Sequence, residues 1–440
     1  MADVTPKDHE GGRMSVAKQA MLSFYWFATN AQWSAILIIL LPKQAETLGG
    51  DVNKGFTVSI ILGIGAFISM VAAPLLGAWS DRVRTPWGRR RPFLVVGTVL
   101  NCVGLLVMST VPATPNMIVL YTIVFIWIMI FNNVATAPYS ALIPDVVPKD
   151  QRGTASGWMG LMTMLGMFVG GSVGLLLSKI GTQGAYIGLA VIMLLGMAGT
   201  VLSVREPEPP EVEPFKFTTF FQGILDPFKS ADFSWVFWTR FLVVMGTFTV
   251  QEFLQYYMKD SVAGGADKFN YEFFGIHLAN QPHDATSTFM IALLGGAVIS
   301  AFVAGALSDK YGRKLMVYIS GGLQGLVAAV FIFSGNFSVA LIMGLVFGLG
   351  YGAYQSVDWA LASDVLPSED DHAKDMGVWH IAMTMPQVLA PLIAGFLLDR
   401  FQIIGKNAGI PTLGYTVIFG LAVIYFFFGT VMVRNIRGVR

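Results

Sequence analysis

Long apolar segments recur along the whole chain and are separated by short polar stretches. A helix needs about 20 apolar residues to cross the hydrocarbon core of a bilayer, so this pattern predicts membrane-spanning helices rather than a soluble core. We expect twelve of them. In chain order they lie near residues 18–41, 55–79, 92–111, 117–143, 154–179, 182–204, 234–258, 285–308, 315–334, 337–363, 376–399 and 412–433.

The polar segment between the sixth and seventh spans divides the chain into two equal sets of helices. It begins REPEPPEVEP at residue 205 and is too rich in Pro and Glu to cross a membrane. We expect residues 205–233 to be a cytoplasmic linker between an amino-terminal six-helix bundle, residues 1–204, and a carboxyl-terminal six-helix bundle, residues 234–440. The polar loops are too short for a separate globular domain, so the function is expected inside the membrane.

The composition supports a membrane protein and excludes several kinds of chemistry. Hydrophobic residues make up 54% of the chain and charged residues 12%, whereas soluble domains carry about 25% charged residues. The net charge of +1 gives no reason to expect a nucleic-acid partner. One cysteine and five scattered histidines provide no disulfide framework or zinc-ligand spacing, and no nucleotide-binding motif occurs. We therefore expect no cofactor, no metal and no enzymatic activity.

The basic residues are distributed unevenly between the two sides of the predicted bundle. Most of the 28 Lys and Arg residues fall in the two tails and in alternate loops. Because cytoplasmic loops carry an excess of Lys and Arg, both termini are expected to be cytoplasmic. The first 17 residues are polar and lack a short apolar core, so we expect no cleavable secretory signal there. We expect a monomer in the plasma, or inner, membrane.

A short motif occurs once in each half, at the ends of the second and eighth spans. It reads GAWSDRVRTPWGRRRPF in the first half and GALSDKYGRKLMV in the second, and SALIPDVVPKD is echoed by WALASDVLPSED. Parallel six-span repeats are a transporter architecture in which the substrate binds between the repeats. Gly allows helices to approach closely, and Asp with Arg can form a breakable cytoplasmic latch. The alternative is that the basic loops only set the topology. The candidate gate residues are Gly77, Asp81, Gly88, Arg89, Asp145, Gly305, Asp309, Gly312, Arg313 and Asp364.

Asp358 is the leading candidate for coupling transport to a proton. Tyr351, Tyr354, Gln355 and Asp358 fall at i, i+3, i+4 and i+7, which places them on one face of the tenth span. A charge at the bilayer centre costs about 2.5 to 3.5 kcal/mol, so a carboxylate retained there is a functional hypothesis by default. The alternative is a neutral or paired carboxyl that holds helices together.

Two further titratable groups, His380 in the eleventh span and Glu252 in the seventh, are secondary proton-coupling candidates. Each has a structural alternative, because polar pairs commonly join helices in membranes. Arg240 lies near the cytoplasmic end of the seventh span and is expected to extend to the membrane interface.

Amide and aromatic side chains in the spans are candidate ligands for a sugar. Sugar hydroxyls need paired donors and acceptors, and the apolar ring face packs against a flat aromatic ring. The substrate-binding candidates are Asn30, Gln32, Trp33, Asn132, Asn133, Gln251, Gln255, Tyr354, Gln355, Trp359 and Gln387.

The repeated loop motif resembles the signature of the major facilitator superfamily, GxLxDxxGRR/K. Its longer form, SDRVRTPWGRRRPF, further resembles the glycoside-pentoside-hexuronide cation symporters, above all the sucrose/proton symporter branch. The layout agrees over all twelve spans, and the motif match is confined to spans one to five. The resemblance implies the superfamily fold and a central cavity lined by spans 1, 4, 7 and 10.

The chain departs from these relatives at their cation-coupling positions. Alignment of NNVATAPYSALIPD with the sucrose symporters places Met129 where they carry a coupling aspartate. Ser69 and Ala73 stand where the melibiose-carrier branch has two cation-binding aspartates. The coupling group has therefore moved or been lost, and Asp358 is the candidate replacement.

Together these patterns predict a secondary transporter that carries a sugar, such as a sucrose-like disaccharide or glycoside, in symport with a proton. One alternative is an exporter or uniporter of a more apolar small molecule, which the 22 methionines would suit. An alternative from another class is a transport-dead membrane sensor. A channel is disfavoured, because paired gate motifs suit rocking between two closed states.

Overall fold

The computed structural model describes residues 14–80, 82–140, 142, 146–148, 151–204, 206, 226–365 and 372–437. Within these residues, eleven helices are long and apolar enough to cross a membrane. A shorter apolar helix, Trp158–Gly171, lies at the predicted fifth span. Together, the eleven long helices and this shorter one lie at the twelve predicted spans.

Each half of the chain contains a series of helices. The amino-terminal half contains α1 (Val16–Ser34), α2 (Leu41–Ser80), α3 (Arg91–Thr110), α4 (Ile118–Ser140), α6 (Arg152–Gly171) and α7 (Gly174–Ser203). The carboxyl-terminal half contains α9 (Ala231–Gln251), α10 (Leu254–Tyr257), α11 (Pro282–Tyr311), α12 (Arg313–Phe333), α13 (Phe337–Asp364), α14 (His372–Ala408) and α15 (Leu413–Met432). Two π-helical segments, η1 (Ala35–Leu40) and η5 (Met258–Val262), extend α1 and α10. Short 3-10 turns are η2 (Pro115–Met117), η4 (Asp226–Lys229) and η6 (Val433–Asn435).

Two of these helices contain a turn between spans. α2 is interrupted at Gly50, with φ of 69°, so the first span continues through η1 to Gly50 and the second starts at Asn53. Gly181, with φ of 67°, divides α7 in the same way between the fifth and sixth spans. The first span is longer than the expected 18–41, because Gln44 is buried in it rather than exposed in a loop. The Gln44 side-chain oxygen accepts hydrogen bonds from Tyr121 (2.9 Å) and Tyr186 (2.6 Å).

Small residues let the helices of each half pack closely. α1 packs against α6 and α7, and α11 packs against α13. A Cβ atom at Gly166 would lie 2.4 Å from the carbonyl oxygen of Phe27, and one at Gly170 would lie 2.2 Å from that of Ala31. Backbone contact of this kind is typical of helix pairs in membranes.

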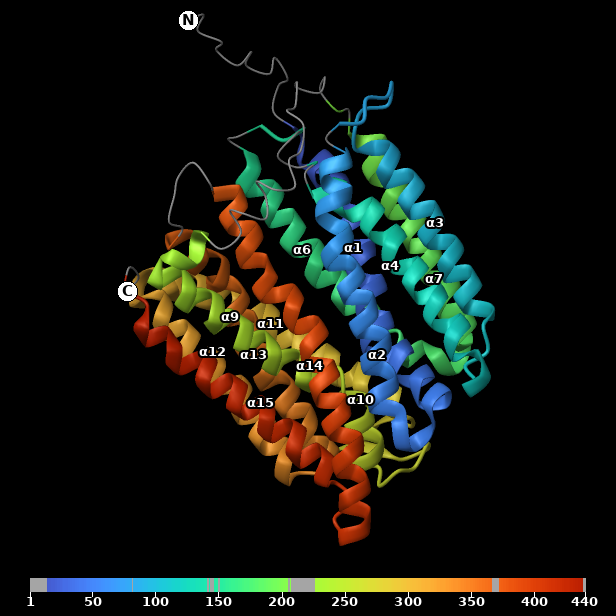
Figure 1. The fold of residues 1–440 in the computed structure, drawn as a ribbon. Helices are drawn as coiled ribbons and strands as arrows, with labels where there is room; N and C mark the ends of the chain where they lie inside the picture. The colour runs from blue at the N-terminus through green and yellow to red at the C-terminus, as the bar shows by residue number, and fades with distance from the viewer. Residues whose placement is uncertain are drawn as a thin grey trace, which may run out of the picture.

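The two halves meet most extensively where α2 runs beside α14 (Figure 1). We call the face that carries the turn at residues 50–53 the distal face, and the face where α1 begins and α15 ends the proximal face. The strands β1 (Tyr271–Phe273) and β2 (Ile276–Ala279) form an antiparallel hairpin between α10 and α11. The sequence pattern treated this stretch only as a polar connection. Phe274 (φ 47°) and Gly275 (φ 84°) form its tight turn.

Candidate functional site

Two opposite charges lie together inside the carboxyl-terminal half. The Nη1 atom of Arg240 on α9 donates to Oδ2 of Asp358 on α13 at 2.5 Å, and both residues are less than 5% exposed. The alternative of a paired carboxyl is thus what the structure shows for Asp358. Removing one partner of such a buried pair typically costs about 3 to 5 kcal/mol, because the other charge is left uncompensated.

The α14 helix completes the surroundings of the guanidinium. Arg240 lies over the ring of Trp379, with its Cζ atom 3.5 Å from the ring centroid, and its Nη2 atom is 3.2 Å from the Met383 sulfur. The expectation that Arg240 extends to the membrane interface is therefore wrong. A buried carboxylate and a flat aromatic face solvate the charge inside the bundle instead.

The rest of the tenth-span stripe lies partly open. Gln355 is exposed, and its Nε2 atom donates to the Tyr351 hydroxyl at 3.1 Å. Tyr354, on the same helix face, is 3% exposed. The predicted stripe therefore passes from an exposed amide to a buried ion pair along one face of α13.

The polar side chains of the seventh span lie in three different surroundings. Thr247 donates to the Gln324 side-chain oxygen on α12 at 3.1 Å, and Gln251 is buried with its Nε2 atom unbonded within the described residues. With its amide oriented to satisfy both ends, Gln255 donates to the Ile39 carbonyl (3.1 Å) and accepts from the Lys43 backbone N–H (3.2 Å). Gln255 thus joins the two halves in this conformation.

The first-span candidates point in different directions. The Nδ2 atom of Asn30 donates to the Trp26 carbonyl at 2.8 Å, within its own helix. Gln32 is fully buried and accepts from Nδ2 of Asn101 on α3 at 2.7 Å. Trp33 is partly exposed and packs edge-on against Phe125 at 6.4 Å between ring centroids. Asn30 and Trp33 are therefore partly exposed, whereas Gln32 is not.

The two asparagines of the fourth span are both largely buried. Asn133 donates through Nδ2 to the Ser69 hydroxyl on α2 at 2.7 Å, which links the fourth and second spans. The Oδ1 atom of Asn132 is buried without a hydrogen-bond partner in the described part of the chain. Asn132 therefore has a buried acceptor that no donor in the described residues satisfies.

Several candidate residues cannot be placed. Asp81 and Asp145 lie outside the described residues. The backbone of Gly305, Asp309, Trp359, Asp364 and His380 is helical, and the surroundings of these residues are outside what the structure describes. Gln387 is partly buried in α14.

The described part of the first gate motif binds a carboxylate from another helix. Gly88 has φ of 105°, and Glu206, just beyond α7, accepts hydrogen bonds from the backbone N–H groups of Arg89 (2.8 Å), Arg90 (2.9 Å) and Arg91 (2.7 Å). These N–H groups are the unpaired donors at the start of α3, where the helix dipole favours negative charge. Glu206 therefore anchors the motif to the end of the sixth span. In the second copy, Gly312 has φ of 94° and separates α11 from α12.

A set of hydrogen bonds and ion pairs closes the distal face between the halves. On α14, Asp399 accepts from the backbone N–H groups of Gly55 (3.1 Å) and Phe56 (2.6 Å), near the start of the second span. Lys54 forms an ion pair with Asp260 at 2.7 Å. The Tyr415 hydroxyl donates to the same Asp260 oxygen at 2.5 Å.

A second ion pair crosses the same face. Lys259 binds Glu46 from the first span and also Asp267, the latter at 2.7 Å. The hydrogen bond from Lys259 lowers the pKa of the exposed Asp267 carboxyl. These contacts tie the loop after the seventh span to the end of the first.

The sequence pattern missed Asp399, Lys54 and Glu206 as functional residues, because each lies at a span end where charge is ordinary. A signal was present in the small residues beside them. A Cβ atom at Gly55 would lie 2.7 Å from Oδ1 of Asp399, and one at Gly395 would lie 1.9 Å from the Ser59 Oγ atom. Glycines facing each other on the second and eleventh spans mark the line along which the halves touch.

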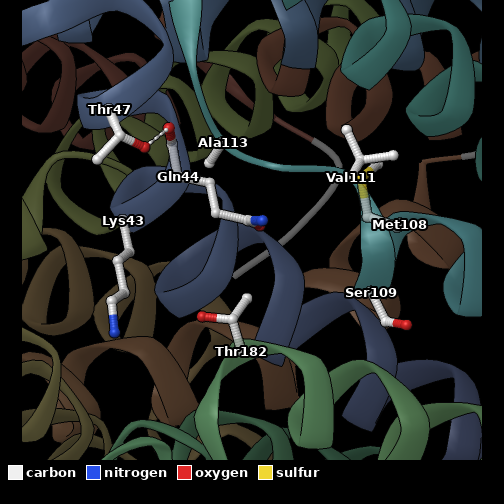
Figure 2. Close-up of a pocket in the computed structure, with 8 residues that line it drawn as sticks. All are labelled: Lys43, Gln44, Thr47, Met108, Ser109, Val111, Ala113 and Thr182. Carbon is white, nitrogen blue, oxygen red and sulfur yellow. Dashed lines mark hydrogen bonds between the residues drawn. The ribbon is translucent and has the colours of Figure 1, made fainter. Parts of the chain in front are cut away.

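A cavity of about 300 Å³ opens beside the distal end of the amino-terminal half. Figure 2 shows the residues that line it, which come from the end of the first span, the end of α3 with its following loop, and the start of the sixth span. They are Lys43, Gln44, Thr47, Met108, Ser109, Val111, Ala113 and Thr182. None of the lining residues is one of the predicted substrate-binding residues.

Comparison with known proteins shows which family the chain resembles. A family model described as MFS/sugar transport protein matches residues 54–434. The chain is 22% identical to an MFS-type transporter of Methanocaldococcus jannaschii over 89% of this chain and 91% of that one. It is 21% identical to the multi-drug resistance efflux pump PmrA of Streptococcus pneumoniae over 79% of this chain and 81% of the pump.

The similarity to plant sucrose transporters is local. The chain is 29% identical to the sucrose transport protein SUC3 of Arabidopsis thaliana over 31% of this chain. That match spans about a quarter, 26%, of the plant protein.

Solved structures share the fold at low identity. The nucleoside transporter NupG, in a point-mutant form, superposes with a TM-score of 0.72 at 14% identity, covering 94% of this chain and 99% of that one. A bacterial homologue of the human lysosomal transporter Spinster, inward-facing and unoccupied, gives a TM-score of 0.68 at 14% identity, covering 96% of this chain and 98% of that one. Since the family model covers most of the chain and the helices have the matching arrangement, the protein belongs to the MFS/sugar transport family of the major facilitator superfamily.

Proposed function

We propose that the protein is a secondary transporter that moves a sugar or related polyol together with a proton by alternating access. That it is a multi-pass membrane transporter follows from its family; the cargo and the coupling are the proposed parts. The family description and the partial likeness to plant sucrose transporters support a sugar as cargo.

The observation that carries the proposal is the buried ion pair between Arg240 and Asp358. Charges inside a membrane bundle are rare and mark ion or substrate pathways. A proton on Asp358 would remove its charge and leave Arg240 without a counter-charge in the dry interior. Proton binding and helix movement are thereby linked at a single contact between α9 and α13.

The closed distal face supports an alternating-access cycle. Contacts between the halves involve Asp399, Lys54 and Lys259 at that face, so this conformation corresponds to access from the proximal face. Because the charge bias places both termini in the cytoplasm, we propose that this is the inward-facing form of a plasma-membrane monomer.

Polar and aromatic groups near the halves' interface support a hydroxylated cargo. Asn132 has an acceptor without a partner within the described residues, Gln251 has a donor in the same condition, and Trp33 is partly exposed. Hydroxyl groups of a sugar can complete such hydrogen bonds, and the Trp33 ring can pack on its apolar face.

Uptake into proteoliposomes tests this function. Purified protein is challenged with a panel of radiolabelled sugars, with and without an imposed proton gradient. We expect wild-type protein to accumulate one of them when the gradient is present. Asp358→Asn is expected to lose accumulation while still exchanging internal for external sugar, because exchange needs no net proton movement.

The matched control is Asp226→Asn, which changes an exposed aspartate paired with Lys229 in η4 and is expected to leave uptake unchanged. Accumulation by Asp358→Asn at the wild-type level would show that Asp358 is not the coupling group. Failure of every sugar to move, in a folded protein, would exclude the sugar cargo.

A second candidate is export of a more apolar molecule. The similarity to the efflux pump PmrA covers 79% of this chain, more than the sucrose transporters match. Met383 beside Arg240, together with Met129 near the fourth-span asparagines, adds polarizable apolar surface. Drug-resistance assays in cells that lack their own efflux pumps distinguish this function, since a sugar symporter would confer no resistance.

A further inference from the structure

Glu252 lies at a break in the seventh span. The α9 helix ends at Gln251, Phe253 has non-helical torsions (φ −104°, ψ 4°), and α10 restarts at Leu254. The first span, which faces this segment, is itself π-helical over η1. Breaks and π-turns in membrane helices occur preferentially at functional sites, because they redirect backbone groups and side chains.

The turn that follows Glu252 is hydrogen-bonded to the first span across the interface between the halves. Gln255 bonds the backbone of Ile39 and Lys43, and the Tyr256 hydroxyl donates to the Pro42 carbonyl at 2.9 Å. These contacts join the two halves near the distal face and must break when that face opens. Closure of the distal face therefore fixes the surroundings of Glu252.

In the closed form Glu252 is buried without compensation. It is 3% exposed, and its Oε2 atom has no hydrogen-bond partner; no ion pair reaches it within the described residues. Carboxylates nearby differ in this respect, because Asp399 accepts two backbone N–H bonds and Asp260 binds Lys54. Glu252 is the acidic side chain of this interface whose negative charge would cost most to bury.

We propose that a proton on Glu252 is the condition for closing the distal face of the transporter. This rests on the proposed alternating-access function and adds a second proton-dependent step to it. With the carboxyl protonated, spans one and seven can pack as they do here. With the carboxyl ionised, packing would bury an uncompensated charge, so the distal face stays open to water.

The proton balance of the cycle follows directly. Water on the distal side delivers a proton to a Glu252 oxygen while that side is open, and the neutral carboxyl permits closure. When the proton leaves toward the proximal side, the ionised carboxylate weakens the closed distal contacts and favours return to the form in which the distal face is open. Glu252 thereby prevents the empty, unprotonated carrier from closing on the distal side.

Other charged and titratable groups surround this gate and have to be separated from Glu252 by experiment. The Tyr256 hydroxyl interacts electrostatically with the carboxyl groups of Glu252, Glu46, Asp260 and Asp399. The Nζ atom of Lys54 lies 5.1 Å from the centroid of the Tyr256 ring. On the eighth span, the Nε2 atom of His283 lies 3.5 Å from Oδ1 of Asp284. Asp284 also interacts electrostatically with Lys43. His283 is the strongest rival, because histidine commonly titrates near neutral pH.

A distance measurement without any cargo tests the proposal. Spin labels are placed on cysteines at Asn53 and Asn407, which are exposed near the distal ends of the second and eleventh spans, in a Cys102→Ala background. Pulsed electron paramagnetic resonance then reports the separation in lipid nanodiscs between about pH 5 and about pH 9. We expect the short, closed distance at low pH and a growing long distance as pH rises.

The size of the pH response and the behaviour of the variants can be predicted if one proton on Glu252 controls the ratio of open to closed molecules. The ratio of open to closed molecules should change by up to about tenfold per pH unit. Glu252→Gln should give the short distance at every pH, and Glu252→Asp should retain the pH response. Asp399→Asn should increase the fraction of open molecules and should also retain the pH response. The folded state of each variant is checked by size-exclusion chromatography.

Three results would overturn the proposal. They are a distance that does not change with pH in the wild type, a pH response that survives in Glu252→Gln, and a response abolished by His283→Gln. A response to sodium in place of pH would equally exclude a proton at Glu252. Since no sugar is present, a wrong cargo assignment leaves this test unaffected.

Discussion

The carboxylate of Asp399 accepts a hydrogen bond of 2.6 Å from the backbone N–H of Phe56, across the interface between the two halves of the protein. Asp399 also accepts from the preceding residue, so it occupies the amino-terminal end of the second span. A carboxylate there satisfies unpaired N–H donors and the positive end of the helix dipole. This contact forms only when α14 and the second span are close together.

Added bulk on the eleventh span should open the distal face. A Cβ atom at Gly395 would lie 1.9 Å from the Ser59 Oγ atom and 2.4 Å from the Gly55 carbonyl oxygen. Overpacking of this kind costs about 1 to 3 kcal/mol, so Gly395→Ala should increase the ratio of open to closed molecules by about 5- to 100-fold. The separation of labels at Asn53 and Asn407 measures this ratio.

The control for that substitution is Gly420→Ala, also within a membrane helix. A Cβ atom at Gly420 meets nothing within 4 Å, so this variant should retain the wild-type distance. An unchanged distance in Gly395→Ala would mean that the distal contacts do not set the position of the halves.

The Arg240 and Asp358 pair should show strong coupling in a double-mutant cycle. Arg240→Met leaves a buried carboxylate alone and should destabilise the protein by about 3 to 5 kcal/mol. Asp358→Leu leaves a buried guanidinium alone, with a similar cost. The double variant should be more stable than either single variant, because neither charge remains. Thermal unfolding in detergent measures all three, and additive effects would contradict a direct pair.

Loss of the Glu206 carboxylate should loosen the proximal loop between the second and third spans. Three consecutive N–H groups at the start of α3 bind this one side chain, so Glu206→Gln should cost about 1 to 2 kcal/mol. Faster proteolysis or hydrogen exchange in residues 82–91 would report it. Glu272→Gln, on the exposed distal hairpin, is the control and should leave that loop unchanged.

The Trp33 ring should contribute to cargo affinity. Aromatic packing contributes about 0.5 to 1.5 kcal/mol, so Trp33→Ala should raise the KM for the transported sugar by about three- to tenfold. Trp33→Phe should retain most of the affinity. Trp79→Ala removes a tryptophan that is 60% exposed and should leave KM unchanged. Equal KM values for Trp33→Ala and wild type would remove Trp33 from the binding site.

The sequence predicted features that depend on local properties of the chain. The number of spans follows from the length of apolar segments, and the family follows from a loop motif read within about twenty residues. The helix face shared by Tyr351, Tyr354, Gln355 and Asp358 follows from helical periodicity. The spans lie near the places that the pattern gives them, although the first continues to Gly50 and the eleventh to Ala408.

Other predictions depended on contacts that local pattern does not contain. Arg240 was assigned to the membrane interface because a long basic side chain near a span end usually reaches water. Its partner, Asp358, is 118 residues away along the chain. Gln32 was a candidate ligand, and the structure turns its amide toward Asn101 inside the amino-terminal half.

By itself the sequence determined that this protein is a multi-span membrane transporter, and its repeated motifs predict two related halves, since hydrophobic length, helical period and motifs are local properties of the chain. Only the tertiary structure decided which charges meet. It paired Arg240 with Asp358, placed Asp399 at the start of the second span and left Glu252 without a partner within the described residues. The physical reason is that such pairing depends on how distant helices cross, and the crossing is set by the packing of all their side chains together.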